Sequence, residues 1–132
     1  MTSPIPSLIG QIIIPLILPI VSLLGAFIFK KTVPKKINYW YGYRTKTSMR
    51  NQDTWNEANK YAAGIMAKSS LILLIVNLFW ATLGVKSILW LFSSYTNFIF
   101  FLIFSSFISF LSILFLTEKR LRFLFDEAGN RK

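Results

Sequence analysis

The segment AAGIMAKSSLILLIVNLFWATLGV, residues 62–85, decides the fold of this chain. Apart from Lys68 near its start, it carries no charged residue. A helix of this length spans about 36 Å at about 1.5 Å per residue, which is enough to cross a hydrocarbon core of about 30 Å. Lysine side chains near helix ends can extend to the lipid headgroups, so Lys68, and Lys86 just beyond the segment, are compatible with a membrane span. The sequence therefore predicts a transmembrane helix over residues 62–85.

Two further segments fit the same description. Residues 5–29 carry no charge, and residues 97–117 are rich in Phe, Ile, Leu and Ser. A cleaved signal peptide is the competing interpretation of residues 5–29, but no basic residue precedes the apolar run and it is longer than an ordinary signal-peptide core. The short linker before residue 97 predicts a tight interfacial hairpin. With 54% hydrophobic residues and a mean hydropathy of +0.53, we predict an all-α membrane protein, a single membrane domain over residues 1–132 with three transmembrane helices.

Basic residues predict the orientation. Nine lie between residues 30 and 68, five follow Thr117, and Lys86 alone falls on the other side. The positive-inside rule places the N-terminus outside, and it places the long loop and a basic tail over residues 118–132 in the cytoplasm. Topology alone thus accounts for the net charge of +10, with anionic lipid headgroups as the default partner and without a nucleic-acid partner.

Several chemistries are disfavoured by the residues the chain lacks. It contains no Cys and no His, so thiolate nucleophiles, imidazole bases and the usual zinc sites are excluded. The predicted spans hold no Asp, Glu or Arg, which disfavours a transport pathway, and Asn77 is expected to form an interhelical hydrogen bond. A carboxylate pair at Asp53 and Glu57 is the alternative that would suit an enzyme. We predict no catalytic residue, metal or cofactor, and no enzymatic activity.

The polar loop-and-helix segment over residues 35–64 contains a helix start. Thr54 and Glu57 have the spacing of a capping box, Asn51 or Asp53 could serve as the cap instead, and the acids at 53 and 57 complement the helix dipole. Trp55, Asn59, Ala62 and Met66 recur on one face of this helix, which continues into the second span. Gly64 predicts a close helix contact or a bend, because glycine inside a helix costs up to about 1 kcal/mol.

Four aromatic residues at positions 39, 40, 41 and 43 surround Gly42 upstream of this helix and are typical of an interfacial belt. Arg44 follows these aromatic residues, and the N–H groups of its planar guanidinium need hydrogen-bond acceptors. The candidates are Asp53 or Glu57, carbonyls at a helix end, or a lipid phosphate. We favour a structural clamp over a ligand contact for Arg44.

The stretch NYWYGYRTKTSMRNQDTWNEANKYAAG, residues 38–64, resembles the signature of the SdpI family, small bacterial membrane proteins named after an immunity protein that protects a cell from its own secreted peptide toxin. The resemblance covers residues 35–64 in detail, and the residues that carry it are Asn38, Gly42, Tyr43, Arg44, Thr45, Trp55, Asn59 and Gly64.

The resemblance implies a multi-pass protein of the bacterial cytoplasmic membrane. The implied function is immunity to, or sensing of, a peptide toxin (bacteriocin) through the aromatic-Arg motif. The alternative is a non-catalytic accessory subunit of a larger membrane complex, with the third span as docking face. An enzyme acting on lipid through Asp53 or Glu57 is a more distant alternative.

Overall fold

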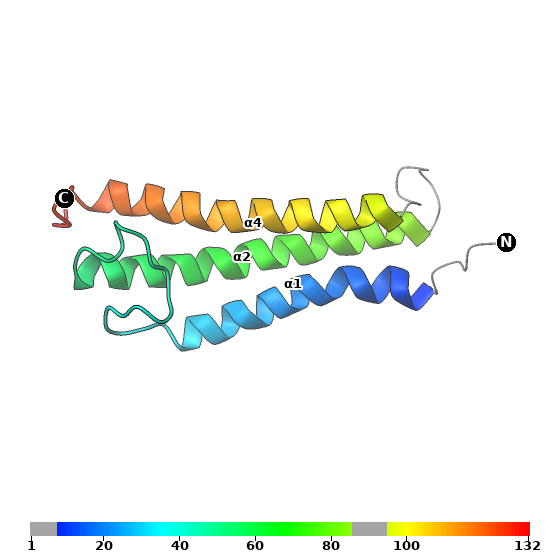
Figure 1. Ribbon diagram of the computed structural model, residues 1–132, viewed down its shortest axis with the longest axis horizontal. Helices are drawn as coiled ribbons and strands as arrows, with labels where there is room; N and C mark the ends of the chain where they lie inside the picture. Colours follow the sequence, from blue (N-terminus) through cyan, green and yellow to red (C-terminus); the bar gives the residue numbers. More distant parts are fainter. Residues whose placement is uncertain (1–7, 86–94) are drawn as a thin grey trace.

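The computed structural model describes residues 8–85 and 95–132 of the chain. This part of the chain is all-helical, with α1 (Leu8–Lys31), α2 (Gln52–Val85) and α4 (Tyr95–Leu124). Helix α2 lies in the middle and packs against α1 on one side and α4 on the other (Figure 1). The loop between α1 and α2 lies at the same end of the molecule as the C-terminus. The hairpin predicted between the second and third spans falls on residues 86–94 and lies outside the described residues.

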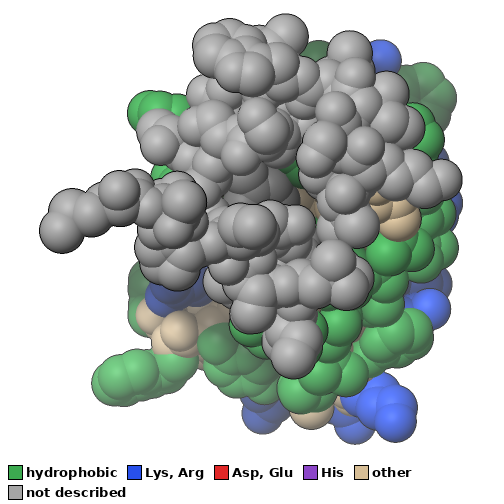
Figure 2. Space-filling model, turned by 90° about the vertical axis from the view of Figure 1, so that its right-hand side faces the viewer, with side chains coloured by type: hydrophobic (Ala, Val, Ile, Leu, Met, Phe, Trp, Pro, Cys, Tyr) green, Lys and Arg blue, Asp and Glu red, His purple; other side chains and the backbone are tan. Residues whose placement is uncertain are grey.

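Two of the helices are long and apolar enough to cross a membrane, over Gln52–Thr82 and Ile99–Leu124. In the most apolar windows of these two segments only 28% and 0% of the residues are buried. The apolar core helix of a soluble protein would instead be mostly covered by its neighbours. Hydrophobic side chains also cover the flanks of the described residues in a view along the bundle (Figure 2). Apolar surface on this scale indicates a lipid environment, whereas a membrane crossing by α1 stays a prediction.

We call the end of the molecule where the α1–α2 loop and the C-terminus lie the polar end. There α2 and α4 extend beyond the spans that the sequence predicts. Helix α2 begins at Gln52 and has 34 residues, or about 51 Å, so it projects beyond a hydrocarbon core of about 30 Å. Helix α4 continues to Leu124, into the stretch predicted as a basic tail. The two extensions pack against each other and against the loop, which stabilises them as helices.

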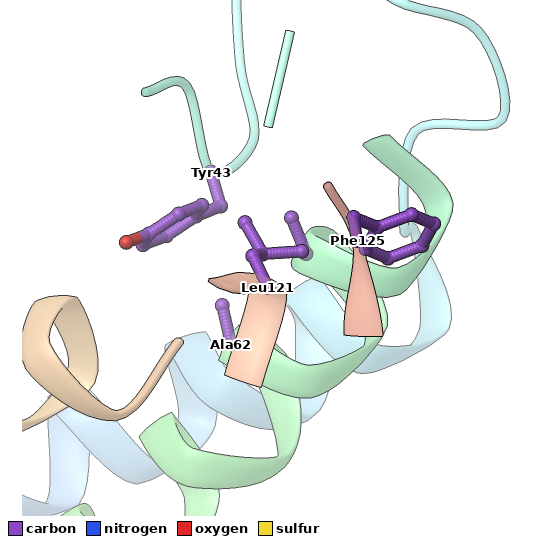
Figure 3. Packing of buried hydrophobic residues seen from close by; sticks show 5 residues of the cluster. Tyr43, Ala62, Leu121 and Phe125 are labelled. Atoms are coloured by element: carbon purple, nitrogen blue, oxygen red, sulfur yellow. The ribbon is translucent and has the colours of Figure 1, made fainter. Parts of the chain in front are cut away.

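A small hydrophobic core lies at this polar end. Tyr43 from the loop, Ala58 and Ala62 from α2, Leu121 from the last turn of α4 and Phe125 directly after that helix are all buried in it (Figure 3). Leu121 is fully covered, and burying a leucine side chain contributes about 1.5–3 kcal/mol. The polar end is therefore packed like a soluble domain, unlike the lipid-exposed helices below it.

The last residues fold back onto this core. Phe125 pairs with Arg131 in an isolated antiparallel bridge, and the turn between them includes Gly129 at a φ of 90°. The Asn51 side-chain amide donates to the Gly129 carbonyl at 2.7 Å, and the Arg50 guanidinium donates to the Asp126 carbonyl at 3.1 Å. These two bonds tie the C-terminal turn to the start of α2.

Within the apolar region, the hydroxyls of Ser22 in α1 and Ser70 in α2 lie 2.7 Å apart and form a polar contact between the two helices. Asn77 is fully buried, but its amide donates to the Leu73 carbonyl in the same helix at 2.7 Å. Among the described residues the interhelical hydrogen bond predicted for Asn77 is not formed, because its amide donates within α2 and its Oδ1 has no hydrogen-bond partner.

Candidate functional site

Residues 32–51, together with the helix turns they contact at the polar end, form the candidate site, which we call the clasp. Its first anchor is Trp55, whose side chain is fully buried and whose indole N–H donates to the Pro34 carbonyl at 2.9 Å. Pro34 lies three residues after the end of α1, and Trp55 lies in the first turn of α2. This hydrogen bond therefore ties the end of α1 to the start of α2.

The second anchor joins Gly42 and Tyr43 to Asn59. Asn59 is fully buried, accepts the Tyr43 backbone N–H at its Oδ1 at 2.6 Å and donates its amide to the Trp55 carbonyl at 2.9 Å. Gly42 has a φ of 113°, and a Cβ there would lie 2.6 Å from Asn59 Oδ1 and 2.9 Å from Pro34 Cγ. Glycine is needed at position 42 for both its backbone conformation and its lack of a side chain.

The third anchor ties the clasp to α4 through Glu118. The Thr45 hydroxyl donates to Glu118 Oε1 at 2.6 Å, and the Tyr43 hydroxyl lies 3.2 Å from the same oxygen and 3.2 Å from the Leu114 carbonyl. Burial, and then the Glu118 charge, raise the pKa of the Tyr43 phenol well above its ordinary value. The buried hydroxyl of Ser48 donates to the Tyr43 carbonyl at 2.9 Å and accepts the Thr45 N–H at 2.8 Å, which fixes the loop between them.

The helix cap of α2 differs from the predicted capping box at Thr54 and Glu57. Asn51 Oδ1 accepts the Thr54 backbone N–H at 2.9 Å, and the Thr54 hydroxyl lies 3.1 Å from the Asn51 N–H as its acceptor. Asn51 is therefore the cap, and Thr54 reaches back to it from the first turn. Glu57 pairs with Arg120 of α4 at 3.1 Å instead. Asp53 lies exposed in the first turn of α2, where its charge complements the helix dipole.

The aromatic stretch forms an exposed turn, which we call the aromatic tip, residues 38–41. The Asn38 side chain accepts the backbone N–H groups of Trp40 and Tyr41 at 3.0 and 3.1 Å. Arg44 donates to the Tyr39 carbonyl, so its partner is a carbonyl of the tip and neither Asp53 nor Glu57. Asn38 and Arg44 thus hold the shape of the tip, while the side chains at 39, 40 and 41 are 81%, 89% and 51% exposed.

Gly64 does not make the close helix contact that the sequence predicts. A Cβ built on it would meet no atom within 4 Å. All the other residues that carry the family resemblance lie in the clasp or on the turns of α2 that contact it. Gly64 lies one turn further along α2 and takes no part in these contacts.

Glu118 is the site residue that sequence reasoning missed. It accepts from two clasp residues more than 70 positions earlier in the chain. A signal for it exists, because Glu118 is the first acid after the apolar run that ends at Thr117. Pro34 and the acceptor role of the Tyr39 carbonyl were missed for another reason, since both residues act through backbone carbonyls that any residue could supply.

A groove of about 740 Å³ runs from the clasp along α4, between Tyr43, Thr45 and Glu118 at one end and Ile108 and Leu111 at the other. A second cavity, of about 590 Å³, lies between the loop and the C-terminal turn and is lined by Arg50, Arg122, Asp126 and Lys132 among others. In the described ranges, no group of three or more acidic side chains is placed to hold a metal ion.

Exposed apolar helices joined at one end by a packed polar clasp define a helical membrane protein. The pattern that describes the SdpI/YfhL protein family matches residues 35–117, and the chain belongs to this family. The matched range holds residues 35–51 of the clasp, all of α2 and most of α4, and it leaves out Pro34 and Glu118 at its two ends.

A curated relative is the uncharacterized protein YfhL of Bacillus subtilis (strain 168), which is 45% identical to this chain over 51 residues. The match covers 39% of this chain and 46% of that protein, so the chain aligns with about half the length of its relative. No solved structure matches the chain.

Proposed function

We propose that this protein gives a bacterial cell immunity to a membrane-active peptide toxin, or senses it, by binding the peptide at the polar end of the helices. The proposal rests on membership of the SdpI/YfhL family, on the immunity protein after which the SdpI family is named, and on the clasp. No catalytic step is part of it. The protein would act as a multi-pass protein of the cytoplasmic membrane, with anionic headgroups at its basic flanks.

The observation that carries the proposal is the aromatic tip. Two of its side chains, Tyr39 and Trp40, are more than four-fifths exposed, yet the turn beneath them is held by Asn38 and Arg44. An interfacial belt needs aromatic rings but not a turn fixed by side-chain hydrogen bonds. Aromatic side chains on a fixed backbone supply contact area at low entropic cost, which favours recognition of a partner.

The test is survival of a sensitive bacterium that expresses the chain when it is challenged with secreted antibacterial peptides, beginning with any encoded beside this gene. We expect the unaltered chain to raise survival, and Trp40→Ala and Arg44→Ala to lose that protection. Phe123→Ala is the matched control, because Phe123 is an exposed aromatic residue at the same end, 71% exposed, outside the tip.

The amount and thermal unfolding of each variant in the membrane separate recognition from folding. Trp40 is 89% exposed, so Trp40→Ala should leave unfolding unchanged, whereas Trp55→Ala removes a fully buried side chain and should cost about 3–5 kcal/mol. Full protection by both Trp40→Ala and Arg44→Ala, or no protection by the unaltered chain against any peptide tested, contradicts the proposal.

A second candidate is an accessory subunit of a larger membrane complex. Helix α4 packs mainly on α2, and its phenylalanines at positions 100, 104, 107 and 115 are each more than half exposed. Recovery of a stoichiometric partner after purification in mild detergent would favour this candidate. A protein that purifies alone would favour the first.

A further inference from the structure

Two contacts fix how α1 and α2 are aligned along their length. The helices run antiparallel (Figure 1), and the hydroxyls of Ser22 and Ser70 lie 2.7 Å apart. Nearly one turn closer to the polar end, a Cβ built on Gly25 would lie 3.7 Å from Met66 Cε. Three residues forward along α1 thus match four residues back along α2, as expected for two helices packed side by side.

The same alignment brings Pro15 of α1 to the level of Asn77 of α2. Pro15 lies seven residues before Ser22, and Asn77 lies seven residues after Ser70. At about 1.5 Å per residue, each lies about 10 Å from the serine pair, on the side away from the polar end. Seven residues are nearly two turns, so both positions lie on the facing sides of the helices. Pro19, between these two levels, is fully buried, as expected where the two helices pack closely.

Asn77 carries an acceptor that the described residues do not satisfy. Its side chain is fully buried and its amide donates to the Leu73 carbonyl at 2.7 Å, but its Oδ1 has no hydrogen-bond partner in the described part of the chain. Asn59, equally buried in the same helix, accepts the Tyr43 N–H at 2.6 Å and donates to the Trp55 carbonyl at 2.9 Å. Buried polar atoms are as a rule hydrogen-bonded, so the Oδ1 atom of Asn77 requires a donor.

A second acceptor without a donor lies on α1. Proline has no backbone N–H, so Pro19 cannot donate to the carbonyl of Pro15 one turn earlier. Carbonyls freed in this way inside a membrane are satisfied by a neighbouring helix or by ordered water. Asn77 Oδ1 is an acceptor too, and two acceptors cannot bond to each other. The site therefore needs a ligand that donates in two directions.

Water and a cation both bind to oxygen atoms, and the surroundings favour water. The sequence has no Asp or Glu in residues 8–31 or 62–85, so a cation here would stay uncompensated in an apolar environment, which is unfavourable. A water molecule carries no net charge and offers two donors. Buried waters make roughly two to four hydrogen bonds to polar groups, so the two acceptors suffice to hold one.

We propose that one water molecule is bound between α1 and α2, donating one hydrogen bond to Asn77 Oδ1 and the other to the Pro15 carbonyl. The water ties the proline-containing turn of α1 to α2, about 10 Å from the serine contact. This site lies in the apolar region, away from the clasp. It goes beyond the proposed function, because it concerns how α1 is held and not what the polar end binds.

The test is magnetisation transfer between water and protein, measured by NMR on the isotope-labelled full chain in deuterated detergent micelles. We expect the side-chain amide protons of Asn77 to show a cross-peak to water in both laboratory-frame and rotating-frame spectra. The two cross-peaks should have opposite signs, which mark a bound water and not proton exchange. Asn59 is the matched control, because it is equally buried and bonded within the protein at both its oxygen and its amide, and it should show no such cross-peak.

Two variants locate the water. Pro19→Ala restores an N–H that can bond to the Pro15 carbonyl, so the Asn77 cross-peak should fall severalfold. Leu18→Ala is its control, because Leu18 is the adjacent residue of α1 and is 45% exposed, and it should leave the cross-peak unchanged. Asn77→Leu removes the other acceptor without altering α1. In protein labelled at proline, the carbonyl resonance of Pro15 should then shift upfield as its hydrogen bond is lost.

A cross-peak at Asn77 alone that weakens in Pro19→Ala supports the inference. No cross-peak at Asn77, one of equal strength at Asn59, or an unchanged cross-peak in Pro19→Ala overturns it. An unmoved Pro15 carbonyl resonance in Asn77→Leu does the same. A change in the Asn77 resonances when choline chloride replaces sodium chloride would assign the site to a sodium ion, which also overturns the proposal of a water.

Discussion

At the scale of single residues, the clasp depends on one glycine whose replacement the structure forbids. Gly42→Ala would place a methyl group 2.6 Å from Asn59 Oδ1 on a backbone with a φ of 113°. We expect a loss of about 1–3 kcal/mol in the free energy of unfolding, measured as a lower thermal midpoint by circular dichroism in detergent.

Gly64 is the matched control for this substitution, because it lies in the same segment with open space around it. Gly64→Ala should leave the midpoint unchanged or raise it by an amount equivalent to up to about 1 kcal/mol, since alanine favours the helix. If Gly64→Ala lost as much stability as Gly42→Ala, the contacts of Gly42 in the clasp would not be the cause of its sensitivity.

Tyr43 supplies a prediction about pH. Burial and the Glu118 charge raise the pKa of its phenol, so the folded protein keeps a proton that the unfolded chain loses near pH 10. The stability contributed by this group is therefore fully present below about pH 10 and is lost as the pH rises through the folded pKa. Tyr43→Phe should remove that decline, measured as thermal midpoint against pH. An equally steep decline in the variant would rule Tyr43 out as its source.

At the scale of elements, one residue, Asn51, forms hydrogen bonds with both the start of α2 and the C-terminal turn. Asn51 caps the helix with its oxygen and holds Gly129 with its amide. Asn51→Asp keeps the capping oxygen and loses the amide donor, whereas Asn51→Ala loses both. We therefore expect the free energy of unfolding to fall by about 0.5–2 kcal/mol more in Asn51→Ala than in Asn51→Asp, because only the alanine variant loses the cap. Both variants should increase amide hydrogen exchange in residues 126–132.

Removal of residues 126–132 provides the control for that comparison. In the shortened chain the difference between Asn51→Asp and the unaltered residue should shrink, because Gly129 is no longer there to accept. A difference that persists would assign the effect to the helix cap alone.

The sequence predicted the elements better than it predicted their contacts. Long apolar runs locate α2 and α4, because a helix in lipid has to be apolar along its length. Gly42, Tyr43, Trp55 and Asn59, which the sequence analysis grouped in one segment, lie together in the structure. Their partners were not predictable, since Trp55 and Arg44 bind backbone carbonyls and Thr45 bonds to Glu118 from 73 positions away.

At the scale of the whole molecule, the clasp gives one end of a lipid-facing structure a packed, polar architecture. Helices α1 and α4 each use α2 as their neighbour, and the clasp joins α1 to α2 through Trp55 and the loop to α4 through Glu118. The clasp thereby fixes the relative positions of all three helices at the end where the loop and C-terminus lie together (Figure 1).

This shared end should face the cytoplasm, and the absence of cysteine makes the orientation simple to measure. Thr47→Cys introduces a thiol in the clasp without changing a charge, and Ser3→Cys introduces one near the N-terminus. In spheroplasts, a maleimide that cannot cross membranes should label position 3 and should reach position 47 only after the membrane is permeabilised, because basic residues favour the cytoplasmic side. Labelling of position 47 in intact spheroplasts would place the aromatic tip outside. The peptide would then meet it from the external medium.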